Sequence, residues 1–94
     1  MSTLDTIATK IIKEQELVIG PLAWSEARKV SGLSVDNPHT GAVLVGSGDP
    51  KVVVDQLVAR YERLFGRASH DVCRDAVASL VATMSPAEIP ASLR

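Results

Sequence analysis

A histidine and a cysteine three positions apart, His70 and Cys73, are the residues of this chain best suited to chemistry. Both fall near the start of an expected helix over residues 69–84, where they share one side and the helix N-terminus lowers the thiol pKa. A reactive cysteine is one interpretation of this arrangement. However, Cys73 also lies on the apolar side of that helix, between Val72 and Ala76. Cysteine is commonly a small buried hydrophobic residue, so we favour a structural role and predict no catalytic residue.

A metal site is a weaker use of the same residues. His70 and Cys73, with Asp71, offer two or three ligands, and His39 is far away in the sequence. Cys73 is the only cysteine, which excludes an intrachain disulfide and every motif that needs several cysteines. A single free thiol also fits a reducing compartment. We therefore predict no metal and no cofactor.

The glycine-containing loop over residues 46–51 lies between an expected strand and an expected helix start. Backbone N–H groups and the positive end of a helix can bind an anion there, with Gly48 and Lys51 as candidate contacts. Phosphate-binding fingerprints, however, need further glycines or a Gly-Lys-Ser/Thr ending. Asp49 would fill the anion position with its own carboxylate, and Pro50 removes one donor. A capped turn explains these residues, and anion binding is kept as an alternative.

A second group of basic residues surrounds the junction between two expected helices, near residues 60–74. A helix N-terminus adds positive potential at this junction, so a local anion or acidic-partner site is an alternative there. The candidate contacts are Arg63, Arg67, His70 and Arg74. Acidic residues interleave with them, and we favour a surface of paired charges.

Partner contacts are predicted on the first two helices. The first is apolar over more than one stripe, with Ile12 beside another isoleucine and Val18 inside a continuous apolar triplet, whereas a small core needs a single face. We therefore predict a homodimer that uses Ile12 and Val18. Trp24 is the only tryptophan. We favour a place in the core for it, with a rigid contact to a protein partner as the alternative.

Composition limits the possible functions. The chain has 94 residues, 46% of them hydrophobic and 3% aromatic, which suits one domain with an aliphatic core. Ten basic and eleven acidic residues give a net charge of −1, so nucleic-acid binding is not favoured. No apolar run approaches the roughly twenty residues that span a bilayer, and no secretory leader is recognisable at the N-terminus. We expect a soluble cytoplasmic protein without a membrane partner.

Periodicity and turn residues predict the elements that position these side chains. Helices are expected over 4–19, 21–30, 50–65 and 69–84, and two strands, 33–35 and 42–45, flank the turn-forming residues 36–41. The predicted fold is α+β and mainly helical: four amphipathic helices and one β-hairpin in the order α-α-β-β-α-α. An all-α four-helix bundle is the alternative. Residues 1–94 are expected to form one domain, with a short flexible C-terminal tail from about residue 89.

The predicted function is a small non-enzymatic interaction or regulatory module that acts through protein–protein contacts. Enzymes gather convergent polar and titratable groups in a sizeable pocket, and this chain offers few such groups. One alternative is a small-molecule or anion-binding domain that uses the 46–51 loop or the basic residues near 60–74. The other is a helix-turn-helix nucleic-acid binder, for which the second helix offers only Arg28 and Lys29.

Overall fold

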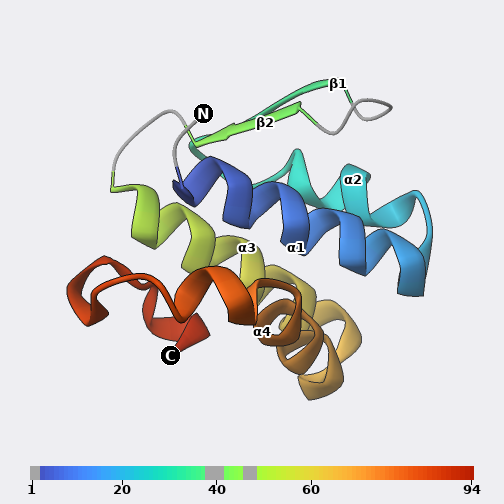
Figure 1. Cartoon of the computed structure of the whole chain (residues 1–94). Coiled ribbons are helices and arrows are strands. Elements are labelled where there is room, and N and C mark those ends of the chain that lie inside the picture. The colour runs from blue at the N-terminus through green and yellow to red at the C-terminus, as the bar shows by residue number, and fades with distance from the viewer. Residues whose placement is uncertain (1–2, 38–41, 46–48) are drawn as a thin grey trace.

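The computed structural model describes residues 3–37, 42–45 and 49–94, and for residues 35–37 and 42–45 it describes the backbone alone. Within these residues it has four α-helices, as Figure 1 shows. They are α1 (Thr3–Ile19), α2 (Leu22–Ala27), α3 (Pro50–Phe65) and α4 (Arg67–Val81), followed by two short 3-10 turns, η1 (Pro86–Glu88) and η2 (Ala91–Leu93). The prediction of a mainly helical protein with four helices is confirmed.

Helix α3 begins and ends where the sequence predicts. The side chain of Asp49 accepts a hydrogen bond from the backbone N–H of Lys51 over 2.9 Å, which caps the helix N-terminus, and Pro50 occupies the first turn. Gly66 follows the last residue at φ 91°, a conformation that suits glycine. The capping residue and proline at the N-terminus and the glycine at the C-terminus therefore determine where α3 begins and ends.

The other helix ends lie within three residues of the expected ones. Helix α4 starts at Arg67 rather than Ser69, because the single residue Gly66 makes the whole turn from α3. Helices α2 and α4 end early because i→i+3 hydrogen bonds replace the i→i+4 pattern. Val30 N–H donates to the carbonyl oxygen of Ala27 at 3.1 Å after α2, and Met84 N–H to that of Val81 at 3.0 Å after α4. These tighter turns are invisible to a periodicity argument.

Two short strands, β1 (Leu33–Asn37) and β2 (Ala42–Val45), pair antiparallel, with Leu33 opposite Val45. The register is irregular between Val35 and Asn37. The connecting residues 38–41 lie outside the described residues, so the hairpin itself stays a prediction. Gly48 and His39, two residues considered above, also lie outside the described part of the chain.

Helix α1 is the central element. It contacts α2, α3, α4 and β2, and in Figure 1 it lies between the strand pair and α4. Its inner face carries four fully buried apolar residues, Ile7, Ala8, Ile11 and Ile12. The prediction that Ile12 contacts a partner is therefore wrong: four neighbouring elements cover more of α1 than one face, so the wider apolar stripe is used inside the chain.

The C-terminal tail, expected to be flexible from about residue 89, packs against the helices in this structure. Ile89, Pro90 and Leu93 are buried. The backbone N–H and the hydroxyl of Ser92 both donate to Oδ1 of Asp55 on α3. Apolar residues alternate with proline and small residues here, and this gives the segment enough buried surface to stay ordered.

Candidate functional site

A buried glutamine fixes how α1 lies on α4. Gln15 is fully buried, and its Nε2 donates to the carbonyl oxygen of Ser69 over 2.8 Å and contacts Sγ of Cys73 at 3.3 Å. Because the Ser69 oxygen can only accept, the amide nitrogen must face it. These contacts set the register of the two helices close to Val18, one turn after Gln15 on α1, and to Val72, which lies between Ser69 and Cys73 on α4.

Beyond Gln15 the two helices border a shallow hollow of about 340 Å³ that is lined by Glu14, Val18, Val72, Asp75 and Ala76. Val18 is 64% exposed and its neighbour Leu17 is 79% exposed. We call these six residues the α1–α4 surface. Among the large hydrophobic side chains of the described residues these two are the most exposed, and they are adjacent in the chain, so they form an apolar patch that a partner can cover.

Charges of both signs border the α1–α4 surface. Glu14 and Asp75 contribute carboxylates to the hollow, and Lys10 and Lys13 are exposed earlier on α1. None of these four side chains forms an ion pair with another residue in the described part of the chain. The surface therefore combines an apolar centre with unpaired acidic and basic groups.

Trp24 is not part of this surface. It is 5% exposed, and its Nε1 donates to Oε2 of Glu16 over 2.7 Å. The alternative in which Trp24 is an exposed partner contact is therefore wrong, because α1 and the core cover the ring. Because its ring is buried, Trp24 cannot face a DNA groove as a residue of a helix-turn-helix would. Lys29, which follows the same helix, pairs with Glu26 at 3.2 Å.

Cys73 is fully buried, as the favoured interpretation predicts. Burial raises the pKa of the Cys73 thiol to about 11, which outweighs the effect of the Gln15 hydrogen bond. Tyr61, also buried, donates its hydroxyl to the carbonyl oxygen of Ala23 over 2.7 Å, and burial raises its pKa too. Neither group has the access or the ionisation that a nucleophile needs.

The basic residues near 60–74 are not brought together in one site. Arg63 lines a hollow with Lys29 and Arg60, whereas Arg74 lines a different hollow with Asp71 and Asp75. Arg67 is exposed at the start of α4.

Two members of this group are engaged within the chain. Arg60 pairs with Glu26 at 2.8 Å, and the guanidinium, with the nearby Lys29, lowers the pKa of that carboxyl. His70 lies 2.7 Å from a carboxylate oxygen of Glu62. Arg60 thus forms a charge pair within the chain, and His70 forms a hydrogen-bond contact with a carboxylate.

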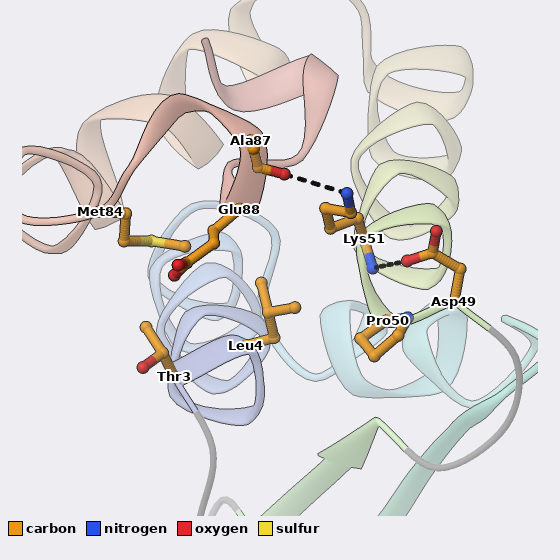
Figure 2. A pocket seen from close by; sticks show the side chains of 8 residues that line it. All are labelled: Thr3, Leu4, Asp49, Pro50, Lys51, Met84, Ala87 and Glu88. Carbon is orange, nitrogen blue, oxygen red and sulfur yellow. Dashed lines mark hydrogen bonds between the residues drawn. The ribbon is translucent and has the colours of Figure 1, made fainter.

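The loop residues that the structure describes line a separate pocket of about 330 Å³, shown in Figure 2. Leu4 and Met84 supply apolar walls, and Lys51 stands at one side with its Nζ donating to the carbonyl oxygen of Ala87 over 3.0 Å. Glu88 points its carboxylate toward the N-terminal end of α1 (Figure 2). The pocket is mostly apolar and its polar groups lie at its edges.

The described residues lack two further kinds of feature. They contain no group of three or more His, Cys, Asp or Glu side chains placed to hold a metal ion. Nor does any described helix combine the length and the apolar character needed to cross a membrane.

No protein-family model, no curated protein and no solved structure matches this chain.

Sequence reasoning missed two residues that organise the site. Gln15 occupies an apolar position of α1, four residues after Ile11 and four before Ile19, and a polar residue on an apolar stripe is a recognisable signal of a buried hydrogen bond. Glu88 of the pocket gave no comparable signal, because its place depends on how the tail folds back.

Proposed function

We propose that this protein is a non-enzymatic interaction module that pairs with a second copy of itself through the α1–α4 surface. The observation that carries the proposal is the exposure of Leu17 and Val18, 79% and 64%, beside a hollow between two helices. Covering such side chains is favourable by about 25 cal/mol per Å² of apolar surface removed from water.

The charges favour a second copy as the occupant. A two-fold interface brings the same patch of both chains together in opposite directions. Lys10 and Lys13 of one copy then approach Glu14 and Asp75 of the other, and each copy supplies both signs. Complementary charges set the register of such a contact, while Leu17 and Val18 contribute most of the apolar burial.

Matched substitutions on two helices test the proposal. Val18→Asp and Leu17→Asp are expected to give monomers, because each puts a charge in the centre of the contact. The controls are Val52→Asp and Leu64→Asp on α3, where the native side chains are 48% and 47% exposed, and these are expected to keep the wild-type mass. Sedimentation equilibrium at one fixed concentration measures all four.

The comparison of the α1 variants with the α3 controls decides whether the α1–α4 surface is the dimer interface. If the α1 variants dimerise as well as the α3 controls do, the α1–α4 surface is not the interface. Circular dichroism of each variant checks that the fold is retained. A monomeric wild type with a different bound protein would replace self-association with a heterologous partner.

A second candidate function, binding of a small molecule, is favoured by the pocket in Figure 2. Its volume of about 330 Å³ is near the lower end of small-molecule sites. Lys51 is engaged with Ala87, whereas the Glu88 carboxylate has no hydrogen bond to any described residue. Because the acidic group is free to bind a ligand and the basic group is already engaged, the pocket favours a ligand with an amine. Its aliphatic chain would be short and would lie on Leu4 and Met84.

Hexylamine and hexanoate are suitable probes for this second candidate. Chemical shifts of the Met84 methyl group are expected to move with hexylamine and not with hexanoate. Glu88→Gln is expected to weaken hexylamine binding about tenfold, the loss of one charge-assisted contact. Equal responses to both probes, or no response, would contradict an amine site.

A further inference from the structure

His70 has a hydrogen-bond acceptor on each side of its ring. Its Nδ1 lies 2.7 Å from Oε2 of Glu62 on α3, and its Nε2 lies 2.6 Å from the backbone carbonyl oxygen of Ser92 in η2. A carboxylate and a carbonyl oxygen accept hydrogen bonds and do not donate them. A neutral imidazole has a single N–H, so both contacts form together only when the ring carries two protons.

The contact to Ser92 holds the C-terminal segment in place. Ser92 is bound from the other direction by Asp55, which accepts from its backbone N–H at 3.0 Å and from its hydroxyl at 2.5 Å. Leu93, the next residue, is 5% exposed. One residue of η2 is therefore tied to both α3 and α4, and these ties keep Leu93 in the core.

The residue that follows η2 is connected to η1, the turn that lines the pocket. Arg94 donates from Nη2 to the carbonyl oxygen of Pro86 over 3.1 Å, which ties the end of the chain to η1. Ala87 and Glu88 of η1 line the pocket. This hydrogen bond thus links the residue after η2 to η1, two residues of which line the pocket.

We propose that His70 is a pH-sensitive strap: its doubly protonated ring clamps η2 against α3, and loss of one ring proton releases the C-terminal segment. Histidine is the side chain whose charge changes between about pH 5 and about pH 8. The neutral ring can donate to Glu62 or to Ser92 but not to both. The segment is held tightly at the acidic end of this range and loosely at the alkaline end.

The charged groups around His70 are few. Glu62 faces it from α3, and Asp55 of the same helix binds the residue that His70 holds. On α4 its flanking charged residues are Arg67, Asp71 and Arg74, all exposed to solvent. The C-terminal segment contributes Arg94, whose guanidinium is bound to Pro86. Glu62 is the charged group in direct hydrogen-bond contact with the ring.

Amide protection factors measured by hydrogen exchange at about pH 5.5 and about pH 8 test the strap. The amides of Leu93 and Arg94, bonded to the carbonyls of Pro90 and Ala91, report on η2. Their protection is expected to fall about tenfold at the higher pH, the effect of losing one hydrogen bond to a charged group. Core amides such as that of Leu57 are expected to keep their protection, which shows that the protein is still folded.

Glu62→Gln is the variant that separates the strap from any general effect of pH. A glutamine amide can donate to Nδ1, so a neutral ring keeps its single N–H for Ser92 and the segment stays held. Protection of Leu93 and Arg94 in E62Q is expected to be the same at both pH values. The proposal is overturned if wild-type protection does not change, or if E62Q loses protection as the wild type does.

Discussion

Gln15 on α1 donates its amide to the carbonyl oxygen of Ser69 on α4, and this contact leaves Oε1 of the same side chain buried without a hydrogen-bond partner. The carbonyl of Ser69 lies inside α4, where it also takes part in helical bonding. The side chain therefore gives a defined register to two helices while it keeps one acceptor unsatisfied. That unsatisfied acceptor costs about 1–3 kcal/mol.

Replacing Gln15 by leucine is expected to leave the free energy of unfolding unchanged or to raise it by about 1 kcal/mol, because the buried acceptor disappears while the volume is kept. Gln15→Ala is the control. It removes the same acceptor but leaves a cavity, and is expected to lower the free energy of unfolding by about 2 kcal/mol. Urea denaturation measures both. A loss with leucine as large as that with alanine would show that the amide contacts stabilise the fold.

The raised pKa of Cys73 predicts how stability depends on alkaline pH. The pKa of the thiol is 9.0 when free and about 11 in the folded protein. Between these values the unfolded chain loses a proton that the folded chain keeps, so the free energy of unfolding falls as pH rises. The full effect is roughly 2–3 kcal/mol, and it is absent below pH 9.

Cys73→Ser isolates this effect, because serine does not titrate in that range and keeps an acceptor for Gln15. Between pH 9 and about 11 the variant is expected to lose less stability than the wild type. Parallel pH profiles would contradict the assignment. At neutral pH a thiol reagent is expected to modify Cys73 only as fast as the chain opens.

Gly66 is predicted to be the glycine least tolerant of substitution among those described. It combines φ 91° with ψ −179°, a conformation open essentially to glycine alone, and a Cβ there would meet no atom within 4 Å. Gly66→Ala is therefore expected to cost about 1–3 kcal/mol through the backbone alone. Gly20→Asn, at φ 72° after α1, is the control and is expected to cost less than about 1 kcal/mol. Equal losses in urea denaturation would contradict this difference.

A helix whose ends carry a capping residue, a proline or a glycine could be predicted from the sequence. Asp49, Pro50 and Gly66 mark both ends of α3, so that helix is predicted to the residue. The ends of α2 and α4 could not be predicted in this way, because 3-10 bonds end both helices without a capping residue. The packed tail was missed for another reason: Asp55 and His70, which hold Ser92, are distant in sequence.

The candidate site was only partly predictable. The apolar run at the end of α1 correctly suggested unused apolar surface, and Val18 lies on that surface. The same argument placed Ile12 there, because the number of elements around α1 cannot be counted from the sequence. Val72 and Ala76 were assigned to the core, and their place beside Val18 depends on the register that Gln15 sets.

The mass of the wild-type protein over a dilution series tests self-association, the central claim, most directly. Sedimentation equilibrium or light scattering from high to low micromolar concentration is expected to give twice the 10.0 kDa chain mass at the upper end. The mass is expected to fall toward 10.0 kDa on dilution, and salt is expected to shift the midpoint because charges contribute to the contact. A mass that stays at 10.0 kDa across the whole series would contradict the account.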